Sequence, residues 1–154
     1  KDKKQVDIKS VYAAIDNGAV SNDWAHNVIA AQIASGARSI EILSNSVFTK
    51  DGAGIKQHNL SKKTHLSDKN DFIVKPIIHM DVDKFLKLID KIRADLRVEI
   101  GNINSGKSTH YELSASKNAR LNRAAVKLLK DKSMTTHTSR KLYANISYNT
   151  MADK

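Results

Sequence analysis

Hydrophobic positions recur with helical spacing near both ends of the chain. Residues 8–15 place apolar side chains at i, i+3, i+4 and i+7, which predicts a helix that Gly18 ends. Residues 24–35 are apolar over so wide an arc that we expect a helix buried on most sides, which Gly36 ends. The other predicted helices begin at Asp81 or Asp83, run from 114 or 116 to about 130, and run from about 139 to 150.

The middle of the chain has a different period. Residues 47–49 and 55–60 are predicted strands on either side of an Asp51-Gly52 turn, and 72–78 form a third strand in which Pro76 favours an edge or an end. We expect residues 98–113 to form a loop, or a weak strand followed by a loop. The pattern therefore predicts a mixed α+β fold, mainly α-helical, with a small antiparallel β-sheet or hairpin, and 154 residues suit a single domain.

The charge of the chain indicates what kind of partner it binds. The chain has 26 Lys+Arg against 16 Asp+Glu, a net charge of +10. Residues 117–141 hold eight of the cations and one anion, Asp131, and so supply most of that excess. A dense basic stretch favours a surface that faces phosphates, although a solubilising surface is the alternative. The candidate DNA-binding residues are Lys117, Arg120, Arg123, Lys127 and Lys141.

Composition excludes several classes of site and protein. The chain has no cysteine, which rules out disulfide scaffolds, cysteine-based zinc sites and thiol catalysis. No apolar run approaches the roughly 18 residues that a membrane span needs. The histidines show no spacing typical of metal ligands. We therefore expect no metal site, no cofactor and no membrane partner.

One string of residues matches a phosphate-binding motif. Residues 101–108 read GNINSGKS, which fits the pattern G-x-x-x-x-G-K-[ST] of a P-loop with Lys107 as its lysine. A P-loop protein needs a parallel sheet built from several strand–helix units, and only about 46 residues follow this string. A polar surface loop is the favoured interpretation, and a P-loop nucleotide binder is the alternative.

A second set of residues suits phosphoryl transfer on DNA. Arg38 follows the buried helix, Lys62 and Lys63 follow about 25 residues later, and His137 and Arg140 form an H-x-x-R motif before the last helix. Two guanidinium groups can hold the non-bridging oxygens of a phosphate, and a lysine can protonate the leaving 5′-oxygen. A histidine can donate a hydrogen bond or move a proton. Each residue alone is a weak signal, and their order and spacing are more specific together.

The segments around these residues resemble the tyrosine recombinase family, and within it the hairpin telomere resolvases, or protelomerases. The resemblance rests on 29–42, on 61–64, and on 118–122 with 139–148. It implies that Arg38 and Arg140 bind the scissile phosphate, that Lys63 or Lys62 is the general acid, and that His137 is an auxiliary residue. An ungapped comparison favours Lys63, and a gap of one residue favours Lys62. The implied partner is double-stranded DNA, with a homodimer on a palindromic site as one arrangement.

The sequence departs from this family in one respect. The family places a further histidine and the nucleophilic tyrosine some tens of residues after the second arginine, whereas this chain continues for 14 residues after Arg140. Tyr143 and Tyr148 match tyrosines that the family uses for packing, so we expect both to face the core. The resemblance thus implies a single catalytic-core domain, 1–154, from a longer telomere resolvase that lacks its nucleophile here and is inactive alone. A conventional integrase core and a non-catalytic DNA-binding module of the same fold are alternatives. The implied location is the cytoplasm of a bacterial or phage-infected bacterial cell, at the nucleoid.

Overall fold

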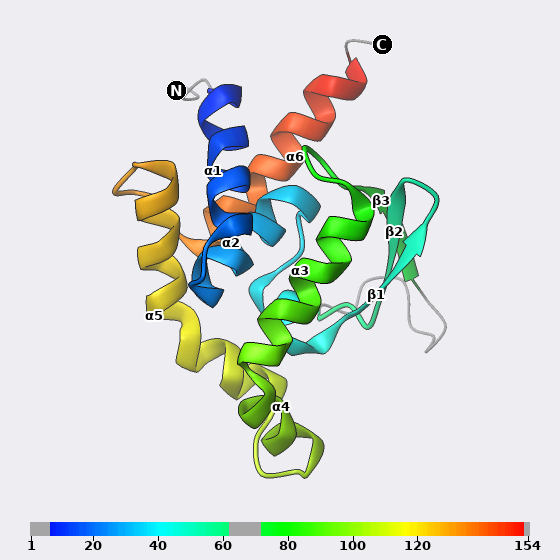
Figure 1. Ribbon diagram of the computed structural model, residues 1–154, viewed down its shortest axis with the longest axis vertical. Helices are drawn as coiled ribbons and strands as arrows, with labels where there is room; N and C mark the ends of the chain where they lie inside the picture. Colours follow the sequence, from blue (N-terminus) through cyan, green and yellow to red (C-terminus); the bar gives the residue numbers. More distant parts are fainter. Residues whose placement is uncertain (1–6, 62–71, 153–154) are drawn as a thin grey trace.

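The structure, a computed structural model, describes residues 7–61 and 72–152, with side chains described as far as residue 148 (Figure 1). Most of this part of the chain is helical, and one antiparallel sheet packs beside the helices, which confirms the mixed, mainly α-helical fold class. The elements in chain order are α1 (Ile8–Val20), α2 (Trp24–Ser35), the π-helix η1 (Glu41–Asn45), β1 (Val47–Asp51), β2 (Gly54–His58), β3 (Phe72–Pro76), α3 (Val82–Asp95), α4 (Arg97–Asn104), α5 (His110–Leu129) and α6 (Thr136–Ala152).

Helix α2 is the centre of the core. Ten of its twelve residues are buried, as its wide apolar arc predicts, and it contacts α1, α3, α5 and α6. Asp23 caps its start by accepting a hydrogen bond from the Ala25 N–H at 3.0 Å. Gly18 does not end α1 but lies within it. A Cβ at this position would stand 2.9 Å from the Ala30 Cβ of α2. The glycine therefore serves the close approach of the two helices and does not stop the first one.

The three strands form one sheet in the order β1-β2-β3 (Figure 1). Asp51 pairs with Gly54 across the predicted turn, and Gly54 pairs in turn with Pro76, where the edge strand β3 ends. Ile55 and Gln57 of β2 are buried and define the inner face of the sheet. Strands β2 and β3 are both shorter than predicted, and the segment that joins them includes Lys62 and Lys63, which lie outside the described residues.

A π-helix connects the end of α2 to the sheet. Arg93 in α3 ties this segment down by donating hydrogen bonds to its backbone carbonyl groups. Its guanidinium donates to the carbonyl oxygens of Glu41 at 3.0 Å, Ile42 at 3.2 Å and Ser46 at 2.8 Å. This one side chain thus fixes the path of the backbone just after Arg38.

The prediction of a loop or weak strand at 98–113 is wrong. Residues Arg97–Asn104 form α4, and α5 begins at His110, where Thr109 accepts a hydrogen bond from the Glu112 N–H at 3.0 Å. The Ser/Thr-x-x-Glu spacing at this point is a helix-start signal that the sequence carries. Among the helices of residues 7–61 and 72–152, none has both the length and the apolar character that crossing a membrane requires.

Candidate active site

The turn that carries Arg38 is built around one glycine. Helix α2 ends at Ser35, and Gly36 takes the left-handed conformation with φ of +73°. A Cβ at Gly36 would also stand 2.5 Å from the ring of Tyr143 in α6. The Ser35 hydroxyl accepts a hydrogen bond from the Ala37 N–H at 3.2 Å, which holds the turn closed. Arg38 therefore leaves the core at a fixed place, directly beside α6.

Arg140 extends from α6 to the turn that precedes Arg38. Helix α6 begins at Thr136, earlier than predicted, and Thr135 caps it by accepting a hydrogen bond from the Thr138 N–H at 3.0 Å. His137 and Arg140 are three residues apart and so lie on one face of the helix. The Arg140 Nε–H donates to the carbonyl oxygen of Gly36 at 3.0 Å, which ties α6 to the turn before Arg38.

These contacts bring three of the predicted catalytic residues into one pocket. Arg38, His137 and Arg140 line a cavity of about 210 Å³ together with Gln32, Thr136 and Asn118. Burial lowers the pKa of Arg140, and the nearby charge of Arg38 lowers it further. The two cations repel each other, and the nearby carboxylate of Glu41 offsets their charge only in part, so the pocket favours a negatively charged ligand.

Glu41 connects the pocket to the sheet. Its carboxylate is buried and lies 3.8 Å from the guanidinium of Arg38. It also accepts hydrogen bonds from the backbone N–H of Arg38 at 2.8 Å and from the backbone N–H of Ser61 at 3.0 Å. Burial acts to raise the pKa of Glu41, but these hydrogen bonds outweigh it and the pKa is lowered. Because Ser61 immediately precedes Lys62 and Lys63, the chain enters that segment next to Arg38.

Lys75 is a site residue that sequence reasoning missed. It pairs with the buried Ile55 across β2 and β3, so its side chain points to the inner face of the sheet. Burial, together with the charges of Arg140 and Arg38, lowers the pKa of Lys75 to about 8, and Glu41 offsets part of this effect. The available signal was a single lysine in an otherwise apolar strand, at the same strand phase as Ile73.

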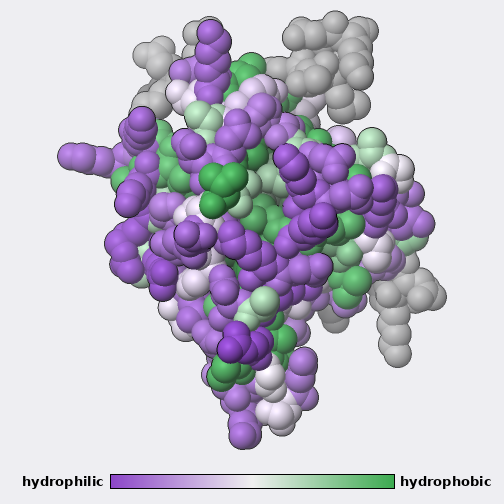
Figure 2. Space-filling view, viewed as in Figure 1, coloured by the Kyte–Doolittle hydropathy of each residue, from purple (hydrophilic) through white to green (hydrophobic). Residues whose placement is uncertain are grey.

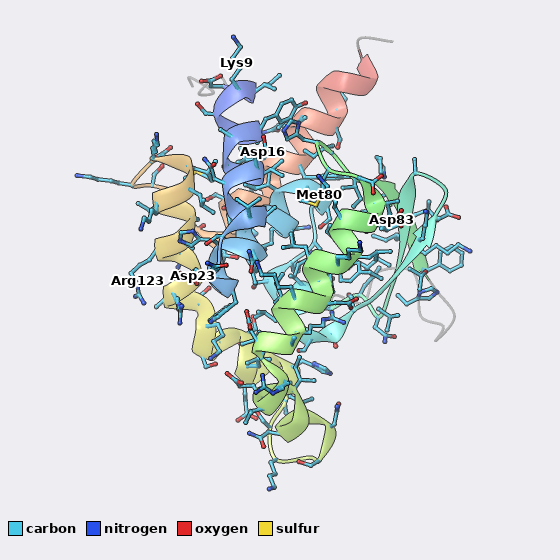
Figure 3. The ribbon with its side chains drawn as sticks, viewed as in Figure 1. Lys9, Asp16, Asp23, Met80, Asp83 and Arg123 are labelled. Carbon is cyan, nitrogen blue, oxygen red and sulfur yellow. The ribbon has the colours of Figure 1, made fainter. Side chains whose placement is uncertain are left out.

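The basic face of α5 lies apart from this pocket. Asn118 lines the pocket, and Lys127 follows it after about two and a half helical turns, so the two residues point to opposite sides of α5. Arg120, Arg123 and Lys127 line a separate cavity with Asp23 and His26. Asp23 and Arg123 are neighbours there, at the start of α2 and the middle of α5 (Figure 3).

Two of these predicted DNA-binding cations are already paired within the protein. Arg120 contacts Asp23 at 3.0 Å and lies over the ring of Trp24, with 4.9 Å between the guanidinium carbon and the ring centroid. Lys117 contacts Glu99 at 3.1 Å. Arg123, Lys127 and Lys141 are exposed, and hydrophilic residues cover most of the face on which α3 and α5 lie (Figure 2). Their role in DNA binding stays a prediction.

The string at residues 101–108 does not adopt the strand–loop–helix form of a P-loop. Its first four residues, 101–104, belong to α4, and a helix rather than a strand precedes Ser105. Gly106 has φ of +82° in the short turn toward α5, and Lys107 is exposed. The geometry agrees with the favoured interpretation of a surface connection.

A larger cavity, of about 730 Å³, lies between α1 and α3. Asp16, His79, Met80 and Lys84 are among the residues that line it, and none of its lining residues belongs to the pocket of Arg38 and Arg140. Lys84, Lys87 and Lys91 supply positive charge to this cavity, but none of the predicted catalytic residues lines it.

No protein-family model matches the sequence, and a search of curated proteins finds no match. Solved structures do match: "protelomerase TelK complexed with substrate DNA" has a TM-score of 0.64 and 21% identity, and "SeMet protelomerase tela covalently complexed with substrate DNA" has a TM-score of 0.70 and 16% identity. Each comparison covers 92% of this chain.

This chain has a protelomerase-like fold. The mixed, mainly α-helical fold class and the resemblance to protelomerases drawn from the sequence are thereby confirmed at the level of the fold. The chain spans 29% of the TelK chain and 47% of the TelA chain, so it corresponds to less than half of either protein.

The two tyrosines of α6 behave differently within this protelomerase-like fold. Tyr143 packs against Gly36, and its hydroxyl donates to the carbonyl oxygen of Pro76 at 2.7 Å, but its side chain is half-buried, so it meets the expectation of a core residue only in part. Tyr148 was expected to face the core and is instead 73% exposed. Ile146 is the buried residue of this turn, and a residue two positions later points to the opposite side of a helix.

Proposed function

We propose that this chain is the DNA cleavage-and-rejoining core of a telomere resolvase, an enzyme that forms covalently closed hairpin ends through a 3′-phosphotyrosine intermediate. The observation that carries the proposal is the meeting of Arg38 and Arg140 in one pocket of a protelomerase-like fold. The net charge of +10 and the repulsion between the two guanidiniums support a DNA phosphate as the ligand.

In this proposal the scissile phosphate binds between the two arginines. Arg38 and Arg140 each donate hydrogen bonds to its non-bridging oxygens and offset the charge that grows there in the transition state. A tyrosine hydroxyl attacks the phosphorus, a bond from phosphorus to the tyrosine oxygen forms, and the bond to the 5′-oxygen breaks. The phosphotyrosine bond then drives rejoining when a 5′-hydroxyl attacks it, so the reaction needs no nucleotide cofactor.

The proton for the leaving 5′-oxygen comes from a lysine. Lys63 or Lys62 remains the proposed general acid, and the contact between Glu41 and Ser61 supports this because it anchors the start of their segment beside Arg38. We add Lys75 as a further cation that faces the phosphate from the inner side of the sheet. His137 is exposed in the first turn of α6 and lines the same pocket, which supports its proposed role as a hydrogen-bond donor to the phosphate.

The nucleophile is proposed to lie outside residues 1–154. The Tyr143 hydroxyl is already hydrogen-bonded to the carbonyl oxygen of Pro76. Tyr148 follows Arg140 by eight residues, which is about 12 Å along a helix. In-line attack requires a hydroxyl held a little over 3 Å from the phosphorus, so the pairing of Tyr143 and the spacing of Tyr148 support a nucleophile from another part of the protein.

The test compares the 154-residue chain with the full-length gene product on a palindromic duplex that carries a suicide nick. We expect the full-length protein to form a denaturation-resistant protein–DNA adduct and hairpin products, and the 154-residue chain to bind DNA without forming an adduct. Arg38→Ala and Arg140→Ala should each lower the cleavage rate by about 10²–10³, the effect of losing one donor to a developing oxyanion. Arg97→Ala, an exposed arginine of α4, is the matched control.

Each alternative gives a distinct result in this experiment. Strand exchange between duplexes without hairpins would identify a conventional integrase core. DNA binding without an adduct in the full-length protein would identify a non-catalytic DNA-binding module. An adduct formed by the 154-residue chain and lost in Tyr143→Phe or Tyr148→Phe would show that the nucleophile is assigned wrongly.

A further inference from the structure

A buried amide links the two halves of the pocket. Gln32 in α2 is 1% exposed, and burying an amide is unfavourable unless its donors and acceptors are paired. Its Nε2 donates to the carbonyl oxygen of Ala37 at 3.2 Å, and its Oε1 accepts a hydrogen bond from the hydroxyl of Thr136. Both the nitrogen and the oxygen of the amide are therefore paired, and their two partners lie in different parts of the pocket.

The two partners of Gln32 stand next to the two arginines. Ala37 immediately precedes Arg38, and Thr136 lies one helical turn before Arg140 on the same face of α6. The backbone N–H of Thr136 in turn donates to the Asn122 Oδ1 of α5 at 2.8 Å, so the start of α6 is held from two directions.

A second contact runs parallel to the first. The Arg140 Nε–H donates to the carbonyl oxygen of Gly36, the residue before Ala37. The short backbone segment of Gly36 and Ala37 is thus tied to α6 twice, once directly by Arg140 and once through Gln32 and Thr136. The distance between the bases of the two arginine side chains depends on these two ties.

We propose that Gln32 is a positioning residue that holds Arg38 and Arg140 at the separation one phosphate requires. This inference rests on the proposed function, in which both arginines bind the same phosphate. Two guanidiniums repel each other while the pocket is empty, and a tie between their supports keeps them in place before DNA arrives. Holding charged groups ready in this way removes the reorganisation that binding would otherwise require.

The same helix offers a matched control. Asn27 is a second fully buried amide of α2, and its Nδ2 donates to the carbonyl oxygens of Gly18 at 2.8 Å and Ser21 at 3.0 Å. These contacts hold the connection between α1 and α2 and do not touch the pocket. Replacing either amide disturbs the core, so only effects specific to Gln32 report on positioning.

The experiment follows the Arg140 Nε–H signal by NMR in the 154-residue chain, at a temperature where every variant is folded. We expect Gln32→Met and Thr136→Val to speed solvent exchange of this proton by about tenfold and to weaken duplex binding by a similar factor, the size of a lost buried hydrogen bond. Thr136→Ser keeps the hydroxyl and should restore both values. Asn27→Leu should lower the unfolding midpoint and leave both values unchanged.

The outcomes separate the inference from the proposed function. If Gln32→Met and Thr136→Val match Asn27→Leu in Arg140 exchange and in affinity, Gln32 is a core amide and the inference is wrong. If the wild-type chain does not bind duplex DNA, the proposed function fails, and the exchange measurement still decides whether Gln32 holds Arg140. If Gln32→Met does not fold, the pair Thr136→Val and Thr136→Ser gives the same decision.

Discussion

The net charge of the pocket depends on one buried carboxylate and the cations that surround it. Glu41 interacts with Arg38 and Lys75, and Arg140 adds a third cation nearby. One anion offsets three cations only in part, so the group retains net positive charge where a phosphate is proposed to bind. Burial first, and then the charges of Arg140 and Arg38, lower the pKa of Lys75 to about 8, although Glu41 offsets part of this effect.

Lys75 makes DNA binding depend on pH. Its pKa is about 8 in the free protein, and a bound phosphate favours the protonated ammonium and raises that pKa. Binding should therefore take up protons above about pH 8, and affinity should fall as pH rises through this value. Calorimetry in two buffers of different ionisation enthalpy measures the uptake. Lys75→Arg stays charged and should remove the effect, whereas equal proton uptake in the variant would assign it to another group.

Sequence reasoning found the residues that sit in motifs and missed the one that depends on packing. Arg38, His137 and Arg140 stand next to helix ends that the sequence marks clearly, and the structure brings them together. Lys75 depends on strand phase and on how β3 packs near α6, which no local pattern specifies. Tyr148 was misplaced although the helical period relative to Ile146 already predicts its exposure.

At the scale of elements, the junction of α2 with α6 depends on the absence of a side chain at Gly36. Gly36→Ala should lower the free energy of unfolding by ~3 kcal/mol, because it combines a left-handed backbone, ~1–2 kcal/mol, with a Cβ that overlaps the Tyr143 ring. Urea unfolding measures this. Gly52 has φ of +58° and open space around it, so Gly52→Ala measures the cost of the left-handed backbone alone. Similar losses for both variants would show that Tyr143 moves aside without cost.

The elements that sequence predicts best are those whose periodicity is strong. The buried α2 and the Asp51-Gly52 turn are where the pattern places them, and β3 is an edge strand as Pro76 favours, although it ends at Pro76 and not at residue 78. Residues 98–113 were mistaken for a loop because α4 is short and has no buried residue, so its apolar pattern is weak. The π-helix η1 could not be predicted either, since its stability comes from Arg93, about 50 residues later in the chain.

At the scale of the whole molecule, the basic face of α5 tests how far DNA extends beyond the pocket. A helix with its side chains is about 10–12 Å across, so a duplex that runs past α5 can reach both the pocket and the long side chains of Arg123 and Lys127. We expect the double reversal Arg123→Glu and Lys127→Glu to weaken binding to duplexes of every sequence. The slope of log affinity against log salt should fall by about two, one for each lost phosphate contact. Fluorescence anisotropy at several salt concentrations measures both values.

The control for this last prediction must change the net charge equally on another helix. Lys84 and Lys87 are exposed on α3, and reversing both alters the charge of the chain as much as reversing Arg123 and Lys127. Charges more than about 8 Å from DNA are largely screened at physiological salt, so the α3 pair should change affinity far less. Equal losses from both pairs would mean that overall charge, and not contact, attracts the DNA. Unchanged binding after the α5 reversal would show that this face points away from DNA, with its paired residues Arg120 and Asp23 serving only the packing of α5 on α2.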